Sequence, residues 1–261
     1  ATVVRRSCSS RCVRKGQEFM EYHKFPYSFA EYRSKKQVEN YDLAEKSIIA
    51  ENKSQYNNKA LFRVCEHLGM SLSELKDKMR SDSHFSKLMG YSVSINASRQ
   101  GTSLESDIIE LISKSVSRFG VELRNLPVNE QIPVKGSGEI LSRVDAKEKF
   151  GKKEYKNNIL KSFDFCGKIE HKKYKSILGF AKVCVGAGGH QDNVRIEAQD
   201  YIAWASEFGN DDTIYIVLYD TDDKQEDFEL LRSLEKGENV WVENHVSVQE
   251  RLHLLLTGSQ N

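Results

Sequence analysis

The spacing of apolar residues changes at Gly120, and this change limits the folds open to the chain. Before Gly120, apolar side chains recur every three or four residues, which is typical of amphipathic helices. After it, short apolar runs separated by turn residues indicate strands. One strong helical pattern, over residues 193–208, interrupts these strands. Together they predict an α/β protein with a mixed central sheet flanked by helices.

The same patterns give approximate limits for each element and for two regions of the chain. Helices are expected over residues 37–80, 103–119, 193–208, 228–234 and 248–256. Strands are expected over residues 121–126, 138–144, 159–165, 175–185, 213–219 and 239–245. Ser103 is the expected N-cap of its helix and Gly120 its stop. We therefore predict an N-terminal helical region over residues 1–95 and a core over residues 96–261.

Charge is unevenly distributed along a chain whose formal net charge is only +1. Residues 147–175 contain ten lysines, and acids concentrate in the C-terminal third. This stretch is either a solvated surface or one cationic face that suits nucleic acid. Residues 1–36 mix basic and aromatic side chains, which fits either an arm that contacts DNA or a packed N-terminal extension.

Cysteine usage and hydropathy bear on the compartment. Five cysteines form no disulfide framework in 261 residues, and Cys8 and Cys12 have no second pair at zinc-binding spacing. The other three cysteines lie in apolar runs and are expected in the core. Apolar stretches are too short for a membrane span, and the N-terminus has no apolar signal core. We expect a prokaryotic cytoplasmic protein with no membrane partner.

Two neighbouring apolar strands each carry one charge, and the two charges have opposite sign. Asp164 lies in the run over residues 159–165, and Lys182 lies within residues 175–185. A charge within an apolar strand is unfavourable unless it is paired or used. A hairpin would bring Asp164 and Lys182 together. Phosphodiester hydrolysis uses this combination, a carboxylate for a divalent metal and a lysine for the attacking water.

The hairpin resembles the catalytic hairpin of the PD-(D/E)XK nuclease superfamily, in particular of type II restriction endonucleases. That superfamily places an aspartate on one strand and an acid-x-Lys pattern on the next. Phe163-Asp164 matches the first element, and Phe180-Ala181-Lys182 matches the second except at Phe180. The resemblance implies a restriction-endonuclease-like core.

The resemblance extends over roughly residues 103–220, because the helix from Asn193 and the strand over 213–219 match the order that follows the hairpin. It implies a type II site-specific deoxyribonuclease that hydrolyses double-stranded DNA with Mg²⁺. Asp164 would bind the metal, and Lys182 would act on the attacking water. A palindromic target would imply a two-fold homodimer.

Phe180 stands where the second acid of the superfamily pattern is expected, so another carboxylate must replace it. The candidates are Glu197, which we prefer as a catalytic and metal-binding residue, Asp192 and Asp200 of the same helix, and Glu105 or Glu110 of the helix over 103–119. A rival acid-x-Lys is Asp145-Ala146-Lys147, with Glu122 or Glu139 as its upstream acid.

Candidate DNA contacts lie around a glycine-rich loop that precedes the helix at Asn193. Glycines allow close backbone approach, and a helix N-terminus favours phosphate. The loop is similar to a Gly-Gly-x-Gln segment found in several restriction enzymes. The predicted DNA-binding residues are Arg99, Lys161, Gly188, Gly189, His190, Gln191, Asn193 and Arg195.

Two other functions remain open from the sequence. Residues 61–80 resemble a helix-turn-helix, because Gly69 can end one helix and Ser71 with Glu74 can cap the next. That pattern would fit a DNA-binding regulator without enzymatic activity. Phe180 would also fit a nuclease fold that has lost catalysis, since fold alone does not imply activity.

Overall fold

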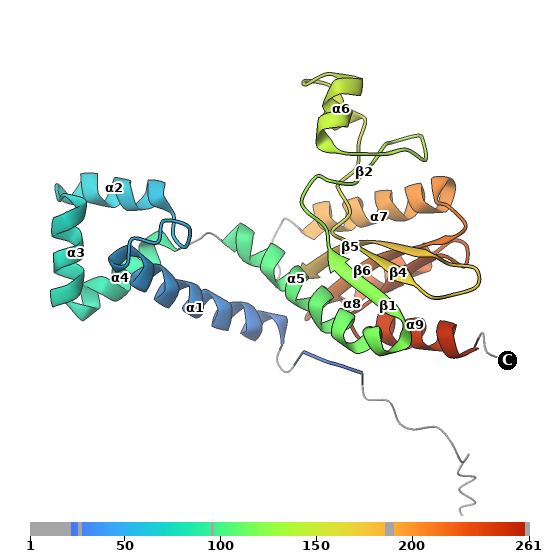
Figure 1. The fold of residues 1–261 in the computed structure, drawn as a ribbon, viewed down its shortest axis with the longest axis horizontal. Helices are drawn as coiled ribbons and strands as arrows, with labels where there is room; N and C mark the ends of the chain where they lie inside the picture. Colours follow the sequence, from blue (N-terminus) through green and yellow to red (C-terminus); the bar gives the residue numbers. More distant parts are fainter. Residues whose placement is uncertain (1–21, 26–27, 95–96, 186–190, 259–261) are drawn as a thin grey trace, which may run out of the picture.

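Helices surround a five-stranded sheet in the computed structural model, which describes residues 22–25, 28–94, 97–185 and 191–258 (Figure 1). The α-helices are α1 (Phe29–Ile49), α2 (Asn58–Leu68), α3 (Leu72–Ser81), α4 (Ser83–Val93), α5 (Ala97–Val116), α6 (Arg143–Phe150), α7 (Gln191–Phe208), α8 (Gln225–Ser233) and α9 (Ser247–Gly258). The strands are β1 (Val121–Asn125), β2 (Ile132–Pro133), β3 (Ile140–Leu141), β4 (Phe165–Ile169), β5 (Ser176–Cys184), β6 (Thr213–Thr221) and β7 (Val240–Glu243). Short 3-10 turns cover Ser117–Phe119 and Tyr155–Asn157.

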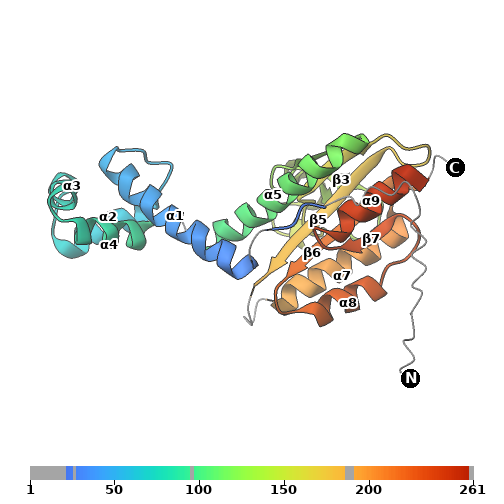
Figure 2. The same ribbon diagram turned by 90° about the horizontal axis from the view of Figure 1, so that it is seen from below.

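The main sheet has the strand order β1-β4-β5-β6-β7. β1, β4 and β5 are antiparallel neighbours, whereas β5, β6 and β7 run parallel. One face packs against α5 and α9, and the other packs against α7 and α8 (Figure 2). The predicted α/β class, with a mixed sheet flanked by helices, is confirmed.

The strands at the centre of the sheet are apolar along their length because both faces of the sheet are covered. β6 lies between two parallel neighbours and is covered on both faces, so its residues are buried from Thr213 to Asp220. Gly179 of β5 lies under the Phe165 ring of β4, where a Cβ atom would come within 2.1 Å of ring carbons. A side chain at this position would displace Phe165 and, with it, the neighbouring Asp164.

The N-terminal helices α1–α4 form an arm that extends to one side of the sheet (Figure 1). The arm has its own apolar core, which includes Ile48, Leu61 and Leu75. The base of α1 belongs to the main core instead. Its first two N–H groups, from Phe29 and Ala30, donate to the Asp222 carboxylate at 2.9 and 2.8 Å.

The observed helices of the arm differ from the predicted ones in two ways. Its helices begin at Phe29, earlier than residue 37, and α4 follows α3 directly because Asp82 accepts from the N–H groups of His84 and Phe85. The expected turn at Gly69 is present in the left-handed conformation, with the capping box of Ser71. Of residues 1–36, those before Tyr22, which include Cys8 and Cys12, and residues 26–27 lie outside the described residues.

The prediction of a strand over residues 138–144 is wrong beyond its centre. Only Ile140–Leu141 pair as β3, and α6 begins at Arg143. The reason is the N-cap Ser142, whose hydroxyl accepts from the N–H of Asp145 at 3.2 Å. This local cap outweighs the alternation of apolar residues.

The expected strand over residues 159–165 is also displaced, since β4 begins only at Phe165. The preceding residues bond to a different partner, the small β2–β3 hairpin. Leu160 N–H donates to Pro133 O and Phe163 N–H to Gln131 O, both at 2.9 Å. The helix α5 begins at Ala97, so Ser103 is not its N-cap.

No helix within the described ranges is both long enough and apolar enough to cross a membrane. Cys65 and Cys184 are buried as expected, while Cys166 is only half-buried, and all three are free thiols.

Candidate active site

The end of β4 creates an open edge on β5. The last pair of the ladder joins Phe165 to Gly179, and β5 continues beyond it to Cys184. Asp164 stands at this point. Its N–H donates to Gly179 O at 2.8 Å, and its Oδ2 accepts from the N–H of Ala181 at 2.9 Å. A carboxylate therefore takes the place of the missing strand at Ala181.

The predicted pair of Asp164 and Lys182 is joined by a third charged residue. Lys182 Nζ lies 3.1 Å from Glu105 Oε1 and 3.9 Å from Asp164 Oδ2. Glu105 comes from α5, which packs along the sheet. The side chains of Lys182 and Glu105 are each 14% exposed and that of Asp164 29%, so the cluster is largely shielded from water but open at Asp164.

Burial sets the protonation behaviour of this cluster. Desolvation and, to a smaller extent, Asp164 raise the pKa of Glu105, Lys182 opposes both, and the net result is a pKa of about 7. Burial also raises the pKa of Asp164, again against the effect of Lys182. For Lys182, burial lowers the pKa, but Asp164 and Glu105 together outweigh it, and the pKa is raised. The cluster therefore has a charged ammonium beside two carboxyls that ionise reluctantly.

Phe180 lies on the same face of β5 as Lys182. It is 1% exposed, and its ring stacks on Tyr201 of α7 with the centroids 5.7 Å apart. Lys182 Nζ lies 4.9 Å from the centroid of the Phe180 ring, which is within cation–π range. Position 180 thus contributes to the core and supports the ammonium through its ring.

Glu197, the preferred replacement acid, lies beside the cluster but outside its direct contacts. Its Oε2 is 2.7 Å from Lys161 Nζ. Its negative charge is among the smaller influences that raise the pKa values of Asp164 and Lys182. Glu105 is the acid that contacts Lys182. Glu110, one turn further along α5, is exposed and pairs with Lys114 at 2.6 Å.

A groove adjoins the cluster through Lys161 and Glu197. It has a volume of about 430 Å³ and brings together lysines from three separate segments. Its lining residues are Lys135, Lys156, Ile159, Leu160, Lys161, Glu197 and Asp200. The three lysines outnumber the two acids of the lining, Glu197 and Asp200, so the groove beside the candidate site has a small excess of positive charge.

The rival acid-x-Lys is excluded as a strand motif, because Asp145 and Lys147 lie on α6. Asp145 is exposed and accepts from the Ser142 hydroxyl at 2.7 Å, and Lys147 Nζ lies over the Tyr155 ring at 5.5 Å. Its proposed upstream acids are placed elsewhere. Glu122 is exposed on β1, and Glu139 pairs with Lys149.

The predicted DNA contacts are only partly within the described structure. Gly188, Gly189 and His190 lie outside the described residues. Arg99 and Gln191 lie on α5 and α7, but their side chains, like that of Asp192, are outside the description. Of the contacts on α7 that are described, Asn193 is exposed, and Arg195 Nε lies 3.9 Å from Asp227 Oδ1.

The donor set of the cluster suits Mg²⁺. Among the described residues, no group of three or more His, Cys, Asp or Glu side chains is arranged to hold a metal ion. Mg²⁺, however, is usually bound by one or two carboxylates, with water and phosphate completing its shell. Glu105 and Asp164 provide two such carboxylates, and burial is the main cause of the raised pKa of each.

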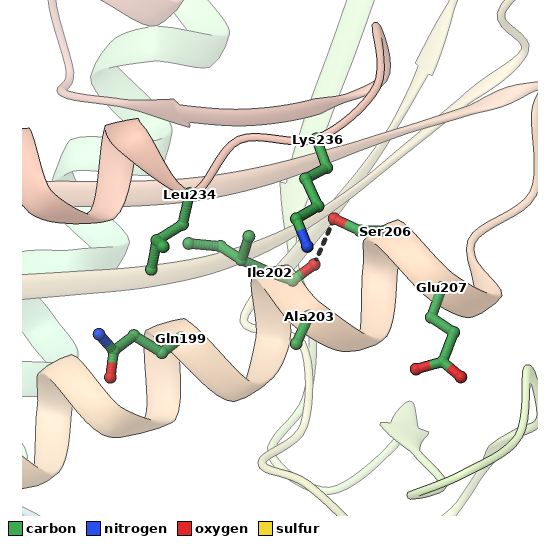
Figure 3. A pocket seen from close by; sticks show the side chains of 7 residues that line it. All are labelled: Gln199, Ile202, Ala203, Ser206, Glu207, Leu234 and Lys236. Carbon is green, nitrogen blue, oxygen red and sulfur yellow. Dashed lines mark hydrogen bonds between the residues drawn. The ribbon is translucent and has the colours of Figure 1, made fainter.

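Two further features lie apart from the cluster and were not foreseen. A hollow of about 420 Å³ lies along α7, where Lys236 extends toward Ile202 and Ser206 (Figure 3). At the end of β6, Asp220 is 1% exposed and its Oδ1 lies 2.7 Å from His245 Nδ1. The position of Asp220 in an apolar strand is the same signal that marked Asp164.

Comparisons of the chain with protein-family models, with curated proteins and with solved structures find no match. By its fold and its site, the chain is an α/β protein with a largely buried carboxylate–lysine cluster at the open edge of its central sheet.

The raised pKa of Glu105 predicts a dependence of stability on pH. A carboxyl whose pKa is about 7 in the folded chain and near 4.5 unfolded stabilises the fold at low pH, and this contribution is lost as the pH rises through 7. Between pH 5 and pH 8, the free energy of unfolding of the wild type should fall by about 2–3 kcal/mol relative to Glu105→Gln. Urea unfolding at both pH values measures this difference.

Glu110→Gln is the matched control, because it removes an exposed carboxylate from the same helix. Its free energy of unfolding should follow the wild type between pH 5 and pH 8. An equal gap between the wild type and Glu105→Gln at both pH values would show that Glu105 ionises normally.

Proposed function

We propose that this chain is a type II site-specific deoxyribonuclease with a restriction-endonuclease-like core, which hydrolyses double-stranded DNA with Mg²⁺. The observation that carries the proposal is the contact of Lys182 with both Glu105 and Asp164 at the open edge of β5. The order of α5, β1, the β4–β5 hairpin, α7 and β6 agrees with the resemblance to the PD-(D/E)XK superfamily.

Each member of the cluster has a role in this proposal. Glu105 and Asp164 would hold Mg²⁺, which supplies Lewis-acid polarisation of the scissile phosphate. Lys182 orients the attacking water and offsets the negative charge that develops on the phosphate. Glu197 pairs with Lys161 and so holds this lysine at the border of the site and the groove.

The lysine-lined groove supports nucleic acid as the substrate. Lys135, Lys156 and Lys161 approach it from separate segments, and phosphate contacts by lysine provide affinity without sequence specificity. Asn193 and Arg195 at the start of α7 are proposed to contact the same duplex. A palindromic target would be bound by a two-fold homodimer.

The alternative of a DNA-binding regulator has less support from the contacts of α3. Lys76 is buried and pairs with Glu51 at 2.5 Å, so its ammonium is committed within the arm. The exposed face of α3 combines Glu74 and Asp77 with Lys78 and Arg80, and Arg80 pairs with Asp77 at 2.8 Å, so this face has no net positive charge to attract phosphate. The regulator would bind DNA without cutting it, so a cleavage assay separates the two functions.

The test is incubation of long, mixed-sequence duplex DNA with Mg²⁺, with and without EDTA. Wild-type protein should give discrete fragments only with free Mg²⁺, and Lys182→Ala should give none because the charge beside the phosphate is lost. Lys147→Ala removes a lysine from the excluded motif and should cut as the wild type does.

Other outcomes would contradict the proposal in different ways. Fragments produced by Lys182→Ala would place the active site elsewhere. Intact DNA that is retarded in a gel by the wild type would favour the regulator or a nuclease fold without activity.

A further inference from the structure

The position of Lys182 raises a question of charge balance. Its ammonium lies 3.1 Å from Glu105 Oε1 and 3.9 Å from Asp164 Oδ2, the two carboxylates proposed to hold Mg²⁺. A positive charge is therefore already held between the proposed metal ligands. An ammonium and a divalent ion in the same place would repel each other, so the two cannot share these contacts at full strength.

We propose that Lys182 is an internal cation that occupies the metal site of the free protein and is displaced when Mg²⁺ binds. The inference deepens the proposed function and rests on it, because it takes Mg²⁺ as the ligand of Glu105 and Asp164. Ammonium and metal compete for the same carboxylates. Metal binding would then release the Lys182 ammonium from its ion pairs and make it available to phosphate and water.

The surroundings of Lys182 provide a place for the displaced ammonium. The Phe180 ring lies 4.9 Å from Nζ on the same face of β5. An aromatic face attracts a cation but provides no oxygen for Mg²⁺. Phe180, which replaces the expected acid, therefore supports the lysine in both states without competing for the metal.

Burial makes the exchange necessary for charge balance. Glu105 and Asp164 are both shielded, and two such carboxylates without a nearby cation would be strongly unfavourable. Lys182 supplies that cation in the free protein. Replacing it with Met, which is neutral and similar in length, leaves the carboxylates uncompensated and should strengthen their attraction for a divalent ion.

The test is calorimetric titration of the full chain with Mg²⁺ in the absence of DNA. It is done at pH 8.5, because removal of Lys182 raises the pKa values of both carboxyls and protons would otherwise compete. Lys182→Met should bind Mg²⁺ roughly ten- to a hundredfold more tightly than the wild type. Lys168→Met removes an exposed lysine from β4 and should bind like the wild type.

The remaining outcomes separate this inference from the proposed function. Equal or weaker Mg²⁺ binding by Lys182→Met, with binding by the wild type intact, overturns the exchange and leaves the nuclease proposal standing. No Mg²⁺ binding by any variant without DNA overturns the exchange, whereas the nuclease proposal is then decided by the cleavage assay, in which phosphate can complete the metal shell. Circular dichroism checks folding, and Lys182→Gln replaces Lys182→Met if the latter does not fold.

Discussion

Replacing Asp164 with Asn is expected to slow Mg²⁺-dependent DNA cleavage by at least about 10²-fold, with the fold retained. The amide oxygen of Asn can still accept from the N–H of Ala181, as Asp164 Oδ2 does at 2.9 Å. The N–H of Ala181 at the open edge of β5 thus keeps its hydrogen-bond acceptor. The substitution removes the negative charge that faces Lys182, and with it one proposed ligand of Mg²⁺.

The measurement is the initial rate of cleavage of a duplex that the wild type cuts, at saturating Mg²⁺. Asp145→Asn is the control, because Asp145 is exposed on α6 and its Asn replacement keeps the polar group at the helix N-terminus. It should cut at the wild-type rate. An Asp164→Asn protein that cuts as fast as the wild type would remove Asp164 from the active site.

Replacing Phe180 with Ala is expected to lower the free energy of unfolding by roughly 3–5 kcal/mol. Phe180 is 1% exposed, and its ring packs on Tyr201 at a centroid distance of 5.7 Å. Truncation leaves a cavity between β5 and α7. It also removes the ring that lies under the Lys182 ammonium.

Urea unfolding compares this variant with Phe180→Leu and Phe62→Ala. Phe180→Leu keeps most of the volume and should lower the free energy of unfolding by less than about 1.5 kcal/mol. Phe62 is 61% exposed in the arm, so its truncation should change the free energy of unfolding by no more than about 0.5 kcal/mol. A small effect of Phe180→Ala would show that the space between β5 and α7 closes without the ring.

The presence of phenylalanine at position 180 has a physical explanation in these contacts. A carboxylate at this position would point into the core beside Tyr201, and a buried charge needs a partner there. In the proposed site the second acid is Glu105, on a helix that packs against the opposite face and reaches Lys182 at the open edge.

Patterns within the sequence predicted the parts of the fold that depend on burial. The apolar runs of β5, β6 and β7 and the stripe of α7 are spaced by their contacts with the core, so they were located within a few residues, whereas α5 begins at Ala97 rather than at Ser103. The errors occurred where local hydrogen bonds prevail. Ser142 started α6 inside an expected strand, and Asp82 started α4 where no helix was expected.

The candidate site was predictable only as far as charge within apolar strands reveals it. Asp164 and Lys182 stood out for this reason, and the structure brings them together. Which of Glu105 and Glu197 contacts Lys182 depends on which helix reaches the open edge and on the pairing of Glu197 with Lys161. Neither fact is encoded in the spacing of residues within one element.

The brevity of β4 determines where water and solutes can reach the interior of this sheet. Its partner β5 is nine residues long, and β4 is only five, so the pairing of the two strands ends at Asp164. If β4 began two residues earlier, its backbone would pair with Ala181 and cover this part of the open edge of β5. An open position in the middle of a layered protein can therefore arise simply because one strand stops early.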